Sequence, residues 1–146
     1  YTDSTMRIPI KTIRVSVGKA GTETPTGTWT MHRAGRWQEL MGPSWGQYGT
    51  HVVNGIFVHS VACGQANSYN LPVGEYLRLG NPASHGCIRA CVADAKWVWD
   101  NCNGSKIHIF DGTYTSNEAL KGPLGRKALT PLRGSKNFDP TDPACK

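Results

Sequence analysis

The chain has 146 residues, enough for one domain with a hydrophobic core. Its 17 glycines and nine prolines, with 38% hydrophobic residues, indicate many turns and favour a mainly β fold. The net charge of +6 suits an anionic polymer as partner, but the basic residues are scattered singly and form no nucleic-acid-binding motif, which argues against nucleic acid.

Three segments of the N-terminal part have the apolar patterns of β-strands. Residues 8–17 alternate apolar and polar side chains, and residues 28–32 repeat this alternation over a shorter length. Residues 50–60 form a third strand region, in which Gly55 marks a bulge.

Two longer stretches between the strands are predicted as loops. Residues 33–48 interleave glycines with Trp37 and Trp45, which either line a groove or cap the core. Residues 61–82 are rich in turn formers, and a loop of this length in a small domain is usually functional. Residues 75–79 are expected to form one helical turn within it.

The C-terminal half contains the clearest helix signal. Apolar residues recur at steps of three and four from 92 to 101, which predicts an α-helix. Residues 106–110 alternate again and predict a closing strand. Residues 111–146 carry prolines and glycines throughout and are expected to wrap over the surface as a tail of the single domain, residues 1–146.

The stretch from Asn81 to Cys91 contains the chemically reactive side chains of the chain. It places a hydroxyl, an imidazole, a glycine, a thiol and a guanidinium within a few residues. A thiol just before the helix that begins at Val92 would feel the positive end of the helix dipole, and Arg89 adds a fixed positive charge. Both effects would lower the pKa of Cys87, so we interpret Cys87 as a nucleophile rather than an inert buried cysteine.

The sequence Ser-His-Gly-Cys-Ile-Arg at residues 84–89 resembles the signature of the YkuD-type L,D-transpeptidases, which remodel bacterial peptidoglycan. Residues 23–29, Glu-Thr-Pro-Thr-Gly-Thr-Trp, resemble the Thr-Pro-x-Gly-x-aromatic segment of that family. Residues 56–60, Ile-Phe-Val-His-Ser, resemble the strand that carries its upstream histidine. Together these stretches follow the order of the family.

This resemblance implies a β-sandwich-like mixed sheet with one main α-helix after the nucleophile. It implies an enzyme whose Cys87 thiolate attacks a stem tetrapeptide, releases D-Ala and transfers the acyl group to an amine of a second stem. If water takes the acyl group instead, the enzyme is an L,D-carboxypeptidase. The expected partners are donor and acceptor stems, an anionic cell-wall polymer and carbapenem-type acylating inhibitors, with no cofactor, no metal and an extracytoplasmic location.

The same resemblance assigns roles to the neighbouring residues. His59 is the base, and the carbonyl of Ser60 fixes its tautomer. His85 is two residues from Cys87 and is the rival base, although the family gives it a supporting role in substrate binding. Backbone N–H groups of Gly86 and Cys87 are expected to form the oxyanion hole.

Two further side chains complete the predicted site. Ser84 is expected to bond the loop backbone near the substrate. Arg89 either pairs with a substrate carboxylate or braces the loop by a bidentate bond, and we favour bracing. We expect the His59 ring within hydrogen-bond range of Cys87. A groove with two entrances would lie between residues 61–82 and 37–48.

Five cysteines allow two disulfides and one free thiol, the pattern of an exported thiol enzyme, whereas all five would be thiols in a reducing cytosol. Cys91 and Cys102 lie at opposite ends of the predicted helix, too far apart to pair. Cys63 and Cys91 each follow a proposed site residue by four positions, so we expect them to be neighbours and to pair, which leaves Cys102 for Cys145. No signal peptide or membrane-spanning run is visible, but a chain that begins at Tyr1 without Met is compatible with N-terminal truncation.

Three other classes of protein compete with this interpretation. A papain-like peptidase usually carries its cysteine before its histidine, whereas His59 precedes Cys87 here. A metal-binding module could use His85, Cys87 and Cys91, but this spacing lacks the paired Cys-x2-Cys of zinc sites. An inactive wall-binding domain is disfavoured because every residue of the motif is present.

Overall fold

In a computed structural model of the chain, the described residues are 9–112, 127–134 and 137–145. Strands outnumber helices, and the mainly β fold class predicted from the sequence is confirmed. The central sheet has the order β2 (His32–Arg33), β5 (Thr50–Val53), β6 (Ile56–Ser60) and β7 (Ile88–Ala90). Strands β6 and β7 run parallel and the other pairs are antiparallel, so the sheet is mixed.

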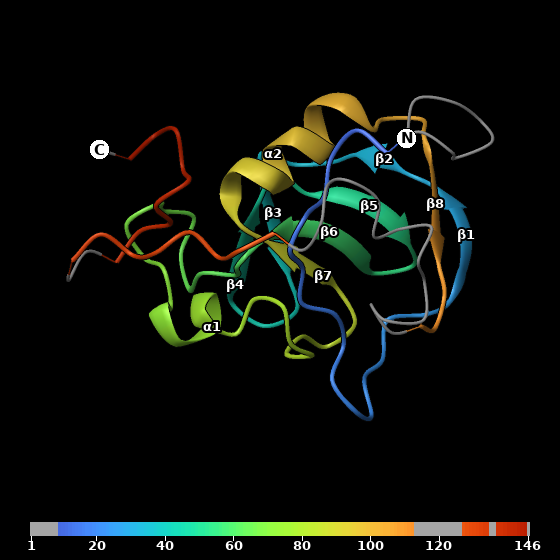
Figure 1. Ribbon diagram of the computed structural model, residues 1–146, viewed down its shortest axis with the longest axis horizontal. Coiled ribbons are helices and arrows are strands. Elements are labelled where there is room, and N and C mark those ends of the chain that lie inside the picture. The colour runs from blue at the N-terminus through green and yellow to red at the C-terminus, as the bar shows by residue number, and fades with distance from the viewer. Residues whose placement is uncertain (1–8, 113–126, 135–136, 146) are drawn as a thin grey trace.

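Two smaller antiparallel pairs flank the central sheet (Figure 1). Strand β1 (Gly27–Thr30) pairs with β8 (Lys106–Ile109), which confirms the predicted closing strand. Strands β3 (Trp37–Leu40) and β4 (Ser44–Gln47) form a hairpin.

Helix α2 (Val92–Asn101) has the predicted bounds and packs on the central sheet. Its buried face contributes Val98 to a core with Val58 and Ile88, while Ala95 packs against Tyr48. Helix α1 (Val73–Leu77) lies in the long segment 61–82 and begins two residues before the predicted helical turn.

A second core joins the surroundings of α1 to the C-terminal part of the chain. Val61, Tyr76 and Leu79 are buried together, and Leu129 and Leu132 pack against them. The Tyr76 hydroxyl donates to the Thr130 carbonyl at 2.8 Å. Figure 1 shows the C-terminal segment, in red, on the same side of the molecule as α1.

The strand predicted at residues 8–17 is not formed in the part that the structure describes. Only Ser16 and Gly18 make isolated bridges, to Arg89 and Ser84. The side chains expected to face solvent are engaged instead, because Arg14 Nε donates to the Leu79 carbonyl at 2.7 Å and the buried Ser16 hydroxyl contacts backbone nearby.

In two further segments, residues 33–48 and 50–60, the chain reverses direction where we predicted no reversal from the sequence. The segment 33–48 is the β3–β4 hairpin rather than a loop, and Gly42 supplies a backbone conformation with φ +72° at its tip. Residues 50–60 are two strands that reverse near Asn54, whose φ is +50°. The register shift falls between His51 and Val53, so the bulge is not at Gly55.

Candidate active site

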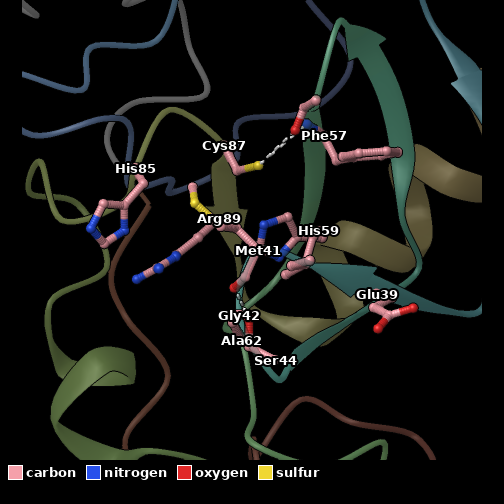
Figure 2. Close-up of a pocket in the computed structure, with 12 residues that line it drawn as sticks. Glu39, Met41, Gly42, Ser44, Phe57, His59, Ala62, His85, Cys87 and Arg89 are labelled. Atoms are coloured by element: carbon pink, nitrogen blue, oxygen red, sulfur yellow. Dashed lines mark hydrogen bonds between the residues drawn. The ribbon is translucent and has the colours of Figure 1, made fainter.

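A cavity of about 490 Å³ contains the predicted nucleophile and both candidate bases (Figure 2). The β3–β4 hairpin tip forms one wall, and the ends of β6 and the segment before β7 form the other. Its lining residues are Glu39, Leu40, Met41, Gly42, Ser44, Gly55, Phe57, His59, Ala62, His85, Cys87 and Arg89.

The pairing of β6 with β7 sets the positions of the reactive side chains. Val58 pairs with Ile88 and His59 with Arg89 in parallel register. Cys87 therefore lies beside Phe57, and alternate residues of both strands point to the cavity face. The Phe57 N–H donates to Cys87 Sγ at 3.5 Å, and the thiol contacts the Gly55 carbonyl at 3.6 Å.

We predicted that the helix dipole activates the Cys87 thiol, but the structure does not place this thiol at the helix. Strand β7 separates Cys87 from α2, which begins only at Val92, and the dipole effect is confined to the first turn. Burial raises the pKa of Cys87 above 9.0, while the Phe57 N–H and the Arg89 charge oppose this rise. The resting residue is therefore mainly a thiol at neutral pH.

His59 is almost fully buried, with 1% of its surface exposed, and its Nδ1 lies 2.5 Å from the Ser60 carbonyl. Because a carbonyl only accepts, Nδ1 carries the hydrogen and Nε2 keeps its lone pair. Burial lowers the pKa of His59 to about 4, the Ser60 carbonyl opposes this, and the Arg89 charge adds to it. The imidazole is therefore neutral at pH 7, with the tautomer that the family resemblance implied.

Besides the Ser60 carbonyl, the backbone of Gly46 in β4 also restricts the position of the His59 ring. A Cβ at Gly46 would lie 2.6 Å from Nδ1 and 2.8 Å from Cγ of His59. Only a glycine permits this approach between a strand backbone and an imidazole. No hydrogen bond joins Cys87 to His59 in the described part of the chain, because the thiol is directed to Gly55 instead.

Arg89 makes bracing contacts through Nη1 alone, and not the bidentate bond to the loop that we expected. Its guanidinium Nη1 donates to Glu75 Oε2 at 2.8 Å and contacts the Ala83 carbonyl at 3.5 Å. The side chain is 15% exposed, yet its Nε is buried without a partner. Arg89 thus ties α1 to the cavity and places a positive charge next to His59.

The loop before Cys87 is held by its own hydroxyl. Ser84 is fully buried, accepts from the Gly86 N–H at 3.1 Å and donates to the Cys87 carbonyl at 2.5 Å. Ser84 does not line the cavity. Because the Gly86 N–H donates to Ser84, this predicted oxyanion donor is occupied in the resting state. Gly86 has φ +115°, and a Cβ there would lie 2.8 Å from Ile56.

The Thr-Pro-x-Gly segment acts on this same loop. The Thr24 hydroxyl donates to the Gly86 carbonyl at 2.7 Å and accepts from the Gly18 N–H at 2.9 Å. The Thr22 hydroxyl reaches the Ser84 carbonyl at 3.2 Å. The sequence motif thus has a physical role, which is to clamp the segment that carries the nucleophile.

The remaining lining residues were only partly anticipated. His85 is exposed at the cavity, whereas segment 61–82, predicted as a wall, contributes only Ala62. Sequence reasoning missed Gly55, Gly46 and the hairpin tip around Met41, whose side chain is 80% exposed. The Asn-Gly pair at 54–55 is a reversal signal that could have identified the first of these.

The predicted disulfides are absent, and all five cysteines are free. Cys91 is buried, and its thiol contacts Asp94 Oδ2 at 3.2 Å, while the Cys63 thiol is directed to the Val61 carbonyl. Cys102 packs against the main core. The prediction that Cys63 pairs with Cys91 and Cys102 with Cys145 is therefore wrong. The argument for export from paired cysteines falls with it.

The alternative metal site at His85, Cys87 and Cys91 has no geometric support. Cys91 is directed to Asp94 and does not line the cavity. Within residues 9–112, 127–134 and 137–145, no group of three histidine, cysteine or acidic side chains is arranged to hold a metal ion. The helices of this part are also too short and polar to cross a bilayer.

A mixed β fold with a cysteine, a buried histidine and an arginine around one cavity defines a candidate thiol enzyme. The model of the YkuD family, described as the L,D-transpeptidase catalytic domain, matches residues 1–122. The chain belongs to this family.

Known proteins are similar to the chain over limited lengths. YciB of Bacillus subtilis, whose name assigns it provisionally to the L,D-transpeptidases, is 59% identical over 27 residues, 18% of this chain and 14% of that protein. An L,D-transpeptidase from Mycobacterium tuberculosis H37Rv aligns with a TM-score of 0.52 and 23% identity, covering 68% of this chain and 42% of that chain.

A Clostridium acetobutylicum structure of a fused Zn-dependent amidase, peptidase and peptidoglycan-binding protein is also similar. It aligns with a TM-score of 0.48 and 26% identity, covering 66% of this chain and 38% of that chain. The chain thus spans less than half the length of each of these three proteins.

Proposed function

We propose that the chain is a peptidoglycan L,D-transpeptidase that uses Cys87 as nucleophile and His59 as general base. The observation that carries this proposal is one cavity lined by Cys87, by a neutral buried His59 and by Arg89, in a chain that belongs to the family. The Ser60 carbonyl holds Nδ1, so the free lone pair of Nε2 is available for a proton.

In the first half-reaction, the Cys87 thiol turns from the Gly55 carbonyl and gives its proton to His59 Nε2. The sulfur attacks the carbonyl carbon that precedes D-Ala in a stem tetrapeptide, and its oxygen becomes an oxyanion. The His59 imidazolium then gives its proton to the departing D-Ala amine, and the C–N bond breaks. The product is a thioester between Cys87 and the stem.

In the second half-reaction, an amine of a second stem attacks the thioester carbonyl. His59 takes a proton from this amine, and the C–S bond breaks as the proton returns to Cys87. A peptide bond between two stems is formed, and the enzyme is regenerated. If water attacks instead, the product is a shortened stem, as in an L,D-carboxypeptidase.

The energetics favour proton transfer coupled to attack over a preformed ion pair. The pKa of Cys87 is raised above 9.0 and that of His59 is lowered to about 4, so thiolate and imidazolium are both disfavoured at rest. The Arg89 charge stabilises the thiolate but destabilises the imidazolium. The oxyanion requires backbone donors near Cys87, and the Gly86 N–H can serve only after Ser84 releases it.

Intact-mass spectrometry with a carbapenem tests the nucleophile. We expect one covalent adduct per chain, located on Cys87 by peptide mapping, and none on Cys87→Ala. The four other cysteines serve as internal controls, because a reagent that labels thiols unselectively would also modify them. An adduct that survives in Cys87→Ala would overturn the assignment.

Product analysis with a purified stem tetrapeptide and an amine acceptor tests the reaction. Transpeptidation predicts a cross-linked product and free D-Ala, whereas hydrolysis predicts only a shortened stem and D-Ala. This substrate lies outside the cytoplasm in bacteria, so we propose an extracytoplasmic location. The net charge of +6 supports binding to an anionic wall polymer.

A further inference from the structure

The C-terminal segment 137–145 lies beyond residues 1–122 that match the family, yet it places two carboxylates in the interior. Asp139 is 2% exposed and Asp142 is 3% exposed. A buried carboxylate is costly unless hydrogen bonds compensate it. Asp142 has such bonds, because its Oδ1 accepts from the Ala144 N–H at 2.9 Å and its Oδ2 accepts from Gln47 Nε2 at 2.9 Å.

Gln47 connects this carboxylate to the candidate base. It is 2% exposed and is the last residue of β4. Its backbone N–H donates to Ser60 Oγ at 2.8 Å, and the Ser60 carbonyl accepts from His59 Nδ1. A series of buried contacts therefore runs from Asp142 through Gln47 and Ser60 to the imidazole.

The position of β4 also determines the surface against which the ring rests. Gly46 lies close to Nδ1 and Cγ of His59, and its neighbour Trp45 is bonded to Cys63 through both backbone groups at 2.8 Å. A shift of Gln47 would thus move both the Ser60 hydroxyl and the Gly46 backbone relative to His59.

We propose that Asp142 is a positioning residue for His59, which it holds through Gln47 and the end of β4. Asp142 touches neither the cavity nor the reacting atoms. The proposal rests on the proposed function, because it concerns the residue assigned there as general base. It makes the C-terminal segment part of the active enzyme, although this segment lies outside residues 1–122 that match the family model.

The pH dependence of acylation reports the state of His59. The charged or titratable groups that share its cavity are Arg89 from β7, Glu39 from β3, and Cys87 and His85 from the preceding loop. None of these contacts Asp142 or Gln47 through a hydrogen bond in the described residues. A substitution of Asp142 should therefore change the pH profile of acylation only by moving His59.

The experiment measures carbapenem acylation of Cys87 against pH for the wild type, Asp142→Ala and Gln47→Met. The wild type should lose activity only near pH 4, where His59 becomes protonated. When the ring loses its fixed position and its burial relaxes, the pKa of His59 should return toward 6.5, so the acid limb should move upward by about 1 to 2 pH units. We expect the rate at neutral pH to fall about tenfold or more.

Gln47→Met removes the same hydrogen bond, between Gln47 Nε2 and Asp142 Oδ2, from its donor side and keeps a similar side-chain volume. If Asp142→Ala does not fold, Gln47→Met alone decides the question. In the double variant Asp142→Ala/Gln47→Met, the acylation rate should fall no further than in the more affected single variant, because both substitutions remove one hydrogen bond.

Asp139→Ala is the matched control. It removes a second buried carboxylate from the same segment, but Asp139 bonds the Val92 N–H and Thr141 rather than β4. It should lower stability and leave the acid limb unchanged. An equal shift in Asp139→Ala, or an unmoved limb in both Asp142→Ala and Gln47→Met, would overturn the proposal.

His59→Gln separates this outcome from a failure of the proposed function. If His59→Gln acylates as fast as the wild type, His59 is not the base and the proposed function is wrong in that respect. If His59→Gln is slow while the Asp142 and Gln47 variants keep the wild-type acid limb, the proposed function stands and only the role of Asp142 fails.

Discussion

At the scale of single residues, Cys87 and His59 form a pair whose neutral states are favoured. The thiol is directed to the Gly55 carbonyl, and His59 is held by the Ser60 carbonyl. Arg89 lies beside His59, and its positive charge favours the Cys87 thiolate while it disfavours the His59 imidazolium. The reactivity of Cys87 should therefore depend on pH near neutrality and above, whereas that of a preformed thiolate would not.

The alkylation of Cys87 by iodoacetamide should rise at alkaline pH. Because burial raises the pKa of this thiol above 9.0, its thiolate fraction at pH 7 is smaller than in an ordinary cysteine. We expect the rate, followed by peptide mapping, to keep increasing through pH 9. A plateau that begins below pH 7 would show instead that a thiolate–imidazolium pair exists at rest.

His59 should make the fold sensitive to acid. Its folded pKa, about 4, lies below its ordinary value of 6.5, so the unfolded chain binds an extra proton between these values. The free energy of unfolding should therefore fall as pH drops from 6.5 toward 4, by about 3 kcal/mol from this residue. Urea denaturation at several pH values measures the fall.

His59→Gln provides the control for this prediction, because glutamine does not titrate. Its free energy of unfolding should change less between pH 7 and pH 4 than that of the wild type. Equal slopes in both proteins would mean that another group, and not His59, binds the proton on unfolding.

The residue scale was the most predictable from sequence. The six-residue motif identifies Cys87, and the upstream strand identifies His59 with its Ser60 carbonyl. What could not be predicted is the environment of each group. The sequence placed Cys87 near the helix that begins at Val92, but three intervening residues pair as β7 and remove the thiol from the dipole.

At the scale of elements, β4 combines two functions in one strand. At its start, Ser44 lines the cavity beside the hairpin tip, and at its end Gly46 and Gln47 contact His59 and its neighbour Ser60. The hairpin that covers the cavity is therefore anchored at the catalytic histidine proposed here. This link follows from packing between distant segments and leaves no periodic signal in the sequence.

Gly46→Ala should impair acylation without unfolding the protein. The added methyl would lie 2.6 Å from His59 Nδ1, so the ring or β4 must move. Overpacking of this kind costs about 1–3 kcal/mol in stability, and a misplaced base costs roughly 10²-fold in rate. The carbapenem acylation rate and urea denaturation measure these two effects separately.

Gly64→Ala is the matched control for Gly46→Ala. Gly64 is exposed, and no atom lies within 4 Å of the position where its Cβ would be. Its acylation rate should equal that of the wild type. If Gly46→Ala also keeps the wild-type rate, close packing of β4 on the imidazole does not matter for the reaction.

Element types were predicted with uneven success for physical reasons. Helix α2 has a strong period and is correct to the residue, because its core face must meet the sheet. The β3–β4 hairpin was missed because its glycines were read as loop signals, although Gly42 only forms the turn. The N-terminal strand failed because Arg14 and Ser16 bond backbone carbonyls instead of facing solvent.

At the scale of the whole molecule, distant segments meet at the start of α2. Cys91 makes no side-chain cap, and Asp139 instead accepts from the Val92 N–H at 2.8 Å while the Thr141 hydroxyl accepts from the Ala93 N–H at 3.1 Å. Nearby, the buried Asp94 holds Lys11 and Lys127. Contacts between residues so distant in the chain carry no local pattern, and the sequence could not reveal them.

The five thiols give the last prediction, which concerns the chain as a whole. All five are free in the structure, and Cys91 and Cys63 are directed to an acceptor oxygen rather than to another sulfur. A thiol count on the denatured, non-reduced protein should therefore give five per chain, and Cys87→Ala should give four. Burial raises the pKa of Cys63 and Cys91 to about 11, so both should react slowly while the protein is folded. A count of one after oxidative folding, with Cys87 still reactive, would contradict the arrangement of the other four thiols. It would also restore the pattern of two disulfides and one free nucleophile that the sequence suggested.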